Sequence, residues 1–163
     1  MKEIPLTRGK VALVDDEDFD RINAFKWYAL YDLKSGNWYA ERRLRIRGSD
    51  KRETVRMHRV IMKSPRRDFD VDHKDRNGLN NQKGNLRICT RTLNLGNQKL
   101  RKSSLTGFKG VSYSNKYKKF QAKIKFNRKA FFLGYFHTPQ EAAVVYNKKA
   151  IELFGEFARI NQT

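Results

Sequence analysis

The pattern of apolar and polar positions in the first sixty residues predicts short strands with two short helices between them. Phe19, Ile22 and Phe25 recur at three-residue spacing, which gives that segment one apolar helical face. A short apolar stretch that begins at His58 predicts one or two further helical turns. Apolar or β-rich runs predict strands at 10–14, 27–33, 38–46 and 53–57. Because a turn containing Gly36 joins the second and third runs, we expect a small β-meander.

The central stretch, residues 71–97, has a different pattern, in which a long polar turn separates two short strands. An apolar-to-acidic step leads into Asp72 and His73, and eleven loop-like residues rich in Asn and Gly follow. Residues 85–88 then alternate between polar and apolar, which predicts a strand. Thr90 is a good N-cap for a following helix. The predicted unit is strand, long turn, strand, helix.

The last third of the chain returns to regular alternation. Strands are predicted at 109–113, 120–126 and 131–137. Strict alternation in the second of these would place four apolar residues against a helix and the polar residues on the other face. The apolar set is Phe120, Ala122, Ile124 and Phe126, and the polar set is Gln121, Lys123 and Lys125. Residues 138–141 form a capping box with Pro at the first helical position, so a helix should begin there and stop at Gly155.

A polar, basic piece at residues 99–103 lies between the central stretch and this last pattern. Such a composition is typical of a link between domains. We therefore expect one domain at 1–98, a linker at 99–103 and a second domain at 104–163.

Charge indicates the class of partner. The 163 residues include 36 Lys or Arg and 17 Asp or Glu, a net charge of +19. Residues 101–163 hold 13 of the basic and 3 of the acidic residues, so the tail is the more basic part per residue. An excess of this size indicates a polyanion as partner.

Other features exclude several classes of protein. The chain has one cysteine, Cys89, so an internal disulfide or a zinc site built on cysteines is excluded, and we expect Cys89 to be a small buried residue. We find no apolar run of the roughly 20 residues that a membrane span needs, and no signal peptide. The expected location is intracellular.

The polar residues of the central stretch suit metal-assisted proton transfer. A neutral imidazole at His73 can take a proton from water near neutral pH. Asp72 and Asn94 offer a carboxylate and an amide oxygen, which suit one Mg2+ or Mn2+ ion better than zinc. Asn85, at the exit of the long turn, has two donors and an acceptor with which to pin it.

These residues resemble a known motif. Asp72-His73, Asn85 and Asn94, at these spacings, resemble the HNH endonuclease motif in its His-Asn-Asn variant, as found in phage and intron homing endonucleases. The resemblance also covers MHRVIM at residues 57–62.

The resemblance implies a ββα-metal core at about residues 68–98. It implies that His73 is the general base, that Asp72 and Asn94 hold the single metal, and that Asn85 orients the loop. The alternative is an Asn- and Gly-rich hairpin with a surface histidine, although a plain hairpin seldom needs so long a turn.

A second resemblance covers residues 104–161. GFKGVSYS, FLGYFHTPQEAAVVYNKKAIELFG and the closing Asn161 resemble the ethylene-response-factor (APETALA-type) DNA-binding domain of plants, related copies of which are appended to HNH homing endonucleases. In that family the face of the sheet lies in the major groove. The DNA contacts implied here are Lys109, Tyr113, Lys116, Lys118, Gln121, Lys123 and Lys125. Lys, Gln and Tyr largely replace the arginine and tryptophan base readers of the plant proteins, and the alternative is that the lysines only keep an exposed sheet soluble.

Three further sets of residues have two interpretations each. The acids at 15–18 suit the first turn of a helix, where the macrodipole favours them, and could also form a metal site. His58 is either a structural hydrogen-bonding residue or a participant in the chemistry. A set of arginines on the meander either forms a solvated face or contacts phosphate. These arginines are Arg42, Arg43, Arg45, Arg47 and Arg52.

The expected protein is α+β: a β-meander leading into the ββα-metal unit, then a three-stranded antiparallel sheet on one helix. We expect a monomeric, metal-dependent HNH endonuclease, similar to homing endonucleases, that nicks double-stranded DNA in a bacterial or phage-infected cytoplasm. The first alternative is a non-catalytic, sequence-specific DNA-binding protein, and the second is a protein that binds or cleaves RNA.

Overall fold

The computed structural model describes residues 1–64, 69–98, 100 and 104–163. The chain divides into two compact units, Met1–Arg91 and Thr92–Thr163, and each is considered by itself. Most of the linker predicted at 99–103 lies outside the described residues, as does residue 68, where the predicted ββα-metal core begins. The domain boundaries drawn from the sequence stay a prediction.

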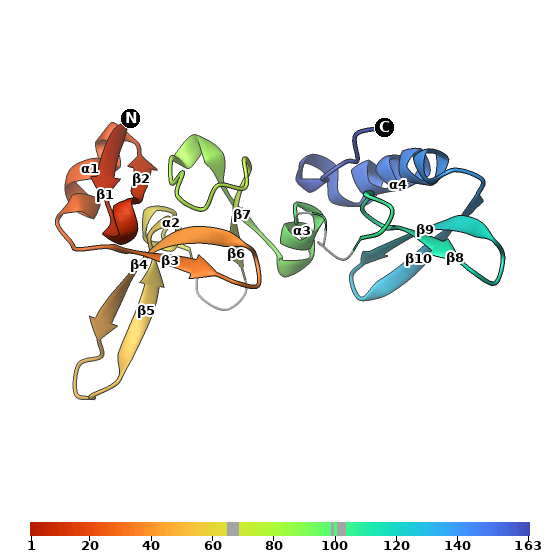
Figure 1. Cartoon of the computed structure of the whole chain (residues 1–163). Helices are drawn as coiled ribbons and strands as arrows, with labels where there is room; N and C mark the ends of the chain where they lie inside the picture. The colour runs from red at the N-terminus through yellow and green to blue at the C-terminus, as the bar shows by residue number, and fades with distance from the viewer. Residues whose placement is uncertain (65–68, 99, 101–103) are drawn as a thin grey trace. The chain divides into compact units, whose positions relative to one another are not determined.

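In its described residues the first unit contains three small antiparallel sheets, two short α-helices and two single 3-10 turns, Thr7–Gly9 and Lys83–Asn85 (Figure 1). Its strands are β1 (Lys2–Pro5), β2 (Val11–Val14), β3 (Tyr28–Asp32), β4 (Asn37–Arg45), β5 (Arg52–Arg56), β6 (Asp70–His73) and β7 (Leu86–Cys89). Its helices are α1 (Asp16–Asn23) and α2 (Met57–Ile61). The sheets are β1-β2, β3-β4-β5 and β6-β7, so the predicted meander and the predicted hairpin are both present.

One apolar core joins these elements. Ile4 of β1, Val14 of β2 and Ile22 of α1 are almost fully buried, and Met57 of α2 and Leu86 of β7 belong to the same cluster. The three-residue spacing predicted the buried face of α1 correctly only in part, because Phe25 lies beyond the helix end and is half exposed. Cys89 is buried, as expected.

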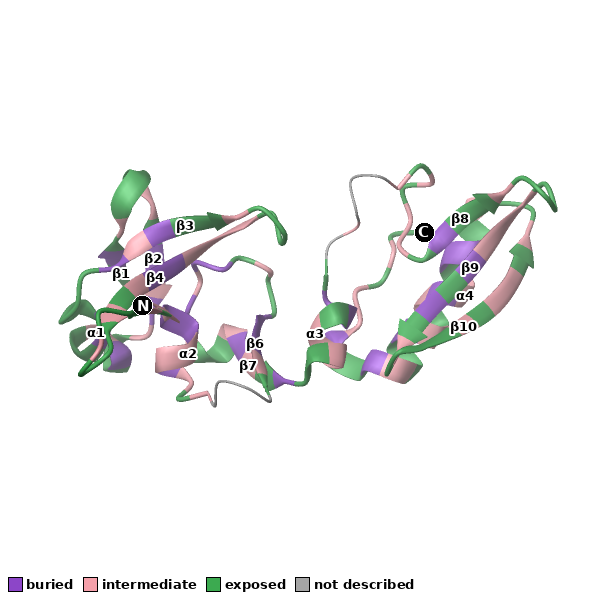
Figure 2. Ribbon diagram, turned by 90° about the horizontal axis from the view of Figure 1, so that it is seen from below, coloured by how far each residue is buried: buried purple, intermediate pink, exposed green. Residues whose placement is uncertain are grey.

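The second unit contains α3 (Arg91–Gly96), which begins at the last residue of the first unit, and a sheet covered by one long helix. The strands are β8 (Val111–Ser114), β9 (Lys119–Phe126) and β10 (Lys129–Phe136), and the order in the sheet is β10-β9-β8. The helix is α4 (Pro139–Phe154). Figure 2 shows the sheet from its uncovered side, with α4 behind it.

The capping box and the alternation along β9 are both present in this unit as predicted. The Thr138 hydroxyl accepts a hydrogen bond from the Glu141 backbone N–H, and the Glu141 carboxylate accepts one from the Thr138 N–H, which makes the predicted capping box. Ala122 and Ile124 are buried toward α4, whereas Lys123 and Lys125 are exposed. Alternation along β9 therefore determines which face of the sheet is covered.

The part of the chain that the structure describes is thus a mixed α+β protein of small antiparallel sheets and four helices. Among the helices of the described residues, none combines the length and the apolar character that crossing a membrane requires.

Candidate active site

The site is built on the β6-β7 hairpin and the long turn that joins its strands. Asp72 pairs with Arg87 and His73 pairs with Leu86 in the antiparallel register. β6 ends at His73, so this side chain stands where the strand gives way to the turn at residues 74–85. The predicted succession of strand, long turn, strand and helix is present as β6, residues 74–85, β7 and α3.

Asn85 makes hydrogen bonds across the turn. Its Nδ2 donates to Asp75 Oδ1 at 2.9 Å and to the Asn80 carbonyl at 2.8 Å. Its Oδ1 accepts from the Asp75 backbone N–H at 3.1 Å. The two amide donors and the amide acceptor that the sequence offered are therefore all engaged in closing the turn.

Asp75 is the second fixed point inside the turn. Its carboxylate accepts from the Asn77 backbone N–H at 2.8 Å and from Asn80 Nδ2 at 2.8 Å, besides its bond with Asn85. Burial raises the pKa of Asp75, but these hydrogen bonds outweigh burial and hold the pKa below its usual value. Since its oxygens hold the turn, Asp75 serves as a structural carboxylate.

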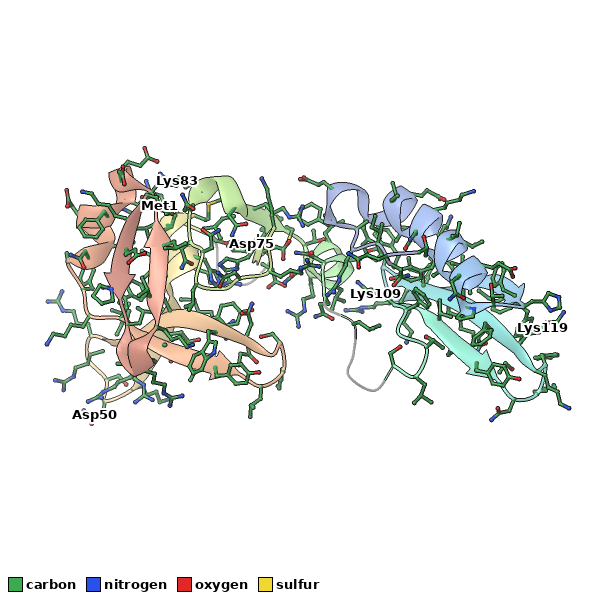
Figure 3. All side chains as sticks on the ribbon, turned by 45° about the horizontal axis from the view of Figure 1, so that its top comes forward. Met1, Asp50, Asp75, Lys83, Lys109 and Lys119 are labelled. Atoms are coloured by element: carbon green, nitrogen blue, oxygen red, sulfur yellow. The ribbon has the colours of Figure 1, made fainter. Side chains whose placement is uncertain are left out.

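The acids at the start of α1 hold the long turn from outside, a role that the sequence did not reveal. Asp15 accepts from the Lys83 backbone N–H at 2.7 Å and from Gln82 Nε2 at 3.2 Å, and its side chain makes no capping bond to α1. Lys83 Nζ lies 2.5 Å from Glu17 and 3.1 Å from Asp18 (Lys83 is labelled in Figure 3). The acids do occupy the first turn of α1 as expected, but their contacts fasten that helix to the long turn.

β2 and β4 hold the other parts of the turn. Leu13 exchanges backbone hydrogen bonds with Leu79 and Asn81, at 2.9 and 2.8 Å. A Cβ added at Gly78 would lie 2.3 Å from the Trp38 carbonyl and 2.7 Å from the Tyr39 ring, so only glycine permits this close approach. The turn is thus fixed by its neighbours on several sides.

His73 is buried, with 5% of its surface exposed. Its Nε2 lies 3.4 Å from Asn81 Oδ1, and Asn81 Nδ2 donates to the Leu79 carbonyl, so the amide oxygen faces the ring. In the tautomer in which Nε2 donates to Asn81, Nδ1 carries the lone pair that can accept a proton. Burial lowers the pKa of His73, while Asn81 and the nearby carboxylates partly oppose this shift. The imidazole is therefore neutral at pH 7, which is the form that a general base needs.

His58, on α2, packs directly against this imidazole. The two ring centroids are 5.0 Å apart with their planes at 87°, and Tyr39 lies 5.8 Å from His58 and 6.1 Å from His73. Burial, and then the charges of His73 and neighbouring arginines, hold the pKa of His58 well below its ordinary value. His58 is thus a neutral ring that limits how the His73 ring can turn.

Asp72 is the carboxylate next to the proposed base. It is 7% exposed, and its Oδ2 accepts from both Nε and Nη2 of Arg87, at 2.9 and 2.8 Å. A buried carboxylate needs a partner of this kind to offset its desolvation. The carboxylate is a hard donor of the type that Mg2+ or Mn2+ prefers.

Two protein side chains are expected to bind a divalent ion, the Asp72 carboxylate and the Asn94 amide. Among the residues that the structure describes, no three His, Cys, Asp or Glu side chains gather to hold a metal. The donor chemistry of Asp72 with an amide oxygen fits one hard ion that keeps several waters. Asn94 lies on α3, in the second unit, so its position relative to Asp72 stays a prediction.

The residues predicted to contact DNA lie in different places in the second unit. Gln121, Lys123 and Lys125 occupy the uncovered face of the sheet, and Lys116 and Lys118 occupy the β8–β9 turn. Tyr113 pairs with Phe120, so it projects from the face that α4 packs on, although it is half exposed. Lys109 Nζ donates to the Gly96 carbonyl at 2.5 Å, which places its ammonium at the C-terminal end of α3.

The arginines of the meander differ in their surroundings. The Arg42 guanidinium lies 3.7 Å from the centre of the Phe25 ring and 5.2 Å from that of Trp27. Its Nε and Nη1 are buried and have no hydrogen-bond partner among the residues that the structure describes. Arg45 and Arg52 are exposed. Arg42 therefore packs on aromatic rings, while the choice between a solvated face and phosphate contact stays open for the exposed arginines.

Sequence similarity indicates the family of this chain. No family model matches the chain, and no solved structure matches it. The chain is 30% identical to an uncharacterized HNH endonuclease of Acanthamoeba polyphaga mimivirus, in an alignment that covers 95% of this chain and 76% of the viral protein. The match includes nearly the whole chain and therefore the β6-β7 hairpin with its pinned turn. The chain belongs to the HNH endonuclease family.

Proposed function

We propose that this protein is a metal-dependent endonuclease that hydrolyses a phosphodiester of double-stranded DNA, with His73 as the general base. The observation that carries this proposal is the buried imidazole that follows Asp72, at the start of a turn that Asn85 closes. Burial lowers the pKa of this imidazole, which favours the neutral form. Such a base accepts the proton of the water that attacks the phosphodiester. Holding the base in one position increases the rate of that proton transfer.

A divalent ion would complete the site. Asp72 and Asn94 would hold one Mg2+ or Mn2+, which would supply positive charge to stabilise the negative charge that develops as the phosphodiester is hydrolysed and its 3′ oxygen leaves. Arg87 keeps the Asp72 carboxylate oriented and compensates its charge. Removal of Arg87 would leave a buried charge without this partner.

The neighbours of His73 would fix the tautomer and the orientation of its ring. Asn81 accepts from one ring nitrogen and selects the tautomer, and His58 limits rotation of the ring by its edge-to-face contact. We assign His58 a positioning role, because its depressed pKa keeps it from carrying a proton at pH 7. The ββα-metal unit of the proposal is therefore supported by a shell of packed and hydrogen-bonded neighbours.

The second unit would bring the nuclease to DNA. Its sheet with one covering helix agrees with the expectation of an ethylene-response-factor-like (APETALA-type) domain. Gln121, Lys123 and Lys125 are the base-reading and phosphate-contacting candidates on the uncovered face, with Lys116 and Lys118 at its edge. Phosphate contacts from these lysines would position the duplex without reading its sequence.

The proposed product is a nick. One Asp72-His73 pair per chain attacks one phosphodiester in each encounter, and a double-strand cut needs two sites related by symmetry or a second visit. A monomer bound in one orientation would present its single site to one strand.

The test compares His73→Ala with His137→Ala on supercoiled plasmid in Mg2+. His137 follows β10 and is exposed, so its replacement controls for the loss of an imidazole. We expect His73→Ala to lose about 100- to 10,000-fold in cleavage rate while DNA affinity changes little, because loss of a general base has that magnitude. Cleavage by His73→Ala at the rate of His137→Ala would refute the assignment, and absence of cleavage by the wild-type chain would favour the non-catalytic DNA-binding alternative.

A further inference from the structure

Three aromatic side chains lie next to one another in the second unit and are open to solvent. Tyr117, Phe132 and Tyr135 are 50%, 52% and 38% exposed. The ring centroids of Tyr117 and Tyr135 are 4.6 Å apart, and those of Phe132 and Tyr135 are 4.9 Å apart. We call this row of rings the aromatic platform. The uncovered face of an antiparallel sheet is ordinarily polar, so contiguous exposed rings indicate a contact surface.

A β-bulge places two of these rings on the same face. Phe132 and Tyr135 are three residues apart, and in a regular strand they would project from opposite faces. The register of β10 shifts between Phe132 and Gly134, so Phe132 pairs with Lys123 and Tyr135 pairs with Gln121. Gly134 has φ +129°, a conformation that side chains rarely adopt. The bulge thus turns both rings to the uncovered face, beside the polar side chains of β9.

The charges around the platform restrict the partner. Strands β8, β9 and β10 contain no Asp or Glu. Lys123 Nζ lies 6.0 Å from the centre of the Phe132 ring, and Lys116 Nζ lies 5.2 Å from that of Tyr117. Exposed rings interspersed with ammonium groups suit a partner that has flat apolar groups joined by negative charges. Nucleic acid with unpaired bases has this chemistry.

We propose that the aromatic platform binds a single-stranded segment of nucleic acid, with bases stacked on Tyr117, Phe132 and Tyr135 and phosphates on Lys116 and Lys123. In a duplex the faces of the bases are covered by neighbouring bases, and only their edges are open in the grooves. Rings of the platform can therefore stack only on bases that have left the duplex. This inference rests on the sheet of the second unit, so it stands apart from the nuclease chemistry.

Full-length protein in chelator, which prevents cleavage, allows the binding to be measured alone. The probe is a fluorescein-labelled DNA strand of about 12 nucleotides, within the size range of single-strand sites, and the readout is fluorescence anisotropy. Phe132→Leu and Tyr135→Leu remove the ring and keep an apolar side chain, whereas Phe132→Tyr and Tyr135→Phe are the matched controls that keep the ring. We expect each leucine variant to bind the strand at least about 5-fold more weakly, since stacking on one ring contributes that much or more, and each ring-keeping variant to bind like the wild type.

A second arm removes the bases and leaves the protein unchanged. An abasic strand of the same length keeps every phosphate, so wild-type protein should bind it at least about 5-fold more weakly than the normal strand if stacking occurs. The leucine variants should lose less on the same change. Equal affinity of wild-type protein for the normal and abasic strands would overturn the proposal, and this result does not depend on any variant folding.

A duplex of the same sequence separates stacking from groove binding. The leucine variants should lose less affinity for the duplex than for the single strand, because a duplex on this face offers no open base face to the rings. If they lose as much affinity for the duplex as for the single strand, the rings contact duplex DNA and the proposal is wrong. Plasmid nicking in Mg2+ is a separate measurement, so failure of single-strand binding and failure of the proposed nuclease function are distinguishable.

Discussion

Replacement of Asn85 by alanine tests whether one amide holds the long turn closed. The change removes three side-chain hydrogen bonds, two donated by Nδ2 and one accepted by Oδ1. A hydrogen bond contributes a net 0.5 to 1.5 kcal/mol or so, and three give roughly 1.5 to 4.5 kcal/mol. Because two of these bonds lie at the surface, we expect a loss in the lower half of that range, about 2 kcal/mol.

The assay is urea unfolding of the full chain, combined with amide hydrogen exchange. The Asp75 N–H donates to Asn85 Oδ1, so its exchange should accelerate in Asn85→Ala while amides in β9 are unaffected. Gln82→Ala is the matched control, since the Gln82 side-chain donor makes one bond, to Asp15, and its loss should cost about 1 kcal/mol. Cleavage should fall in Asn85→Ala, because an open turn no longer fixes His73. If Asn85→Ala destabilises the chain no more than Gln82→Ala does, and Asp75 exchange is unchanged, the turn is held by its outer contacts and our reasoning fails.

Three further predictions concern pH, salt and product. Burial lowers the pKa values of His58 and His73, so the unfolded chain binds more protons than the folded chain below about pH 6.5. In chelator, the free energy of unfolding should therefore be highest above that pH and fall as the pH drops toward 5, with a slope of at most about 1.4 kcal/mol per pH unit for each histidine. Urea unfolding midpoints that stay constant across this window would contradict the folded-state burial of both rings. Lys123→Gln with Lys125→Gln should reduce the log–log salt slope of duplex binding by about 2, one for each lysine that no longer neutralises a phosphate, and an unchanged slope would show that this face does not bind the DNA backbone. Supercoiled plasmid should pass first to the open-circle form, whereas linear DNA at the earliest times, with no open-circle precursor, would contradict cleavage by a monomer.

Local sequence signals predicted much of this fold. The capping box at Thr138 and Glu141 depends on residues three positions apart, so the sequence contains all that is needed to recognise it. Strict alternation along β9 gave the correct covered and uncovered faces for the same reason. In β10 the bulge between Phe132 and Gly134 breaks the alternation, whereas a strict two-residue period would assign Phe132 and Tyr135 to opposite faces. The aromatic platform could not be predicted from that period.

The candidate site shows the same division between local and distant effects. Asn85 closes the turn through partners within ten residues, and its role could be anticipated from its position and its donors. The bonds from Asp15 to Gln82 and Lys83 cross almost seventy residues, and no pattern in the acidic quartet indicates that partner. The contact of His58 with His73 also depends on how α2 packs. Long-range packing of this kind follows from the shape of the core, which a single sequence does not display.

The most direct measurement is a plasmid assay with wild-type protein and His73→Ala, in Mg2+ and in chelator. We expect the wild type to convert supercoiled DNA to open circles in Mg2+ and to leave it intact in chelator. His73→Ala should bind the same DNA and leave it intact in both. Undiminished nicking by His73→Ala, or equal nicking by the wild type in chelator, would contradict a metal-dependent nuclease with His73 as its base.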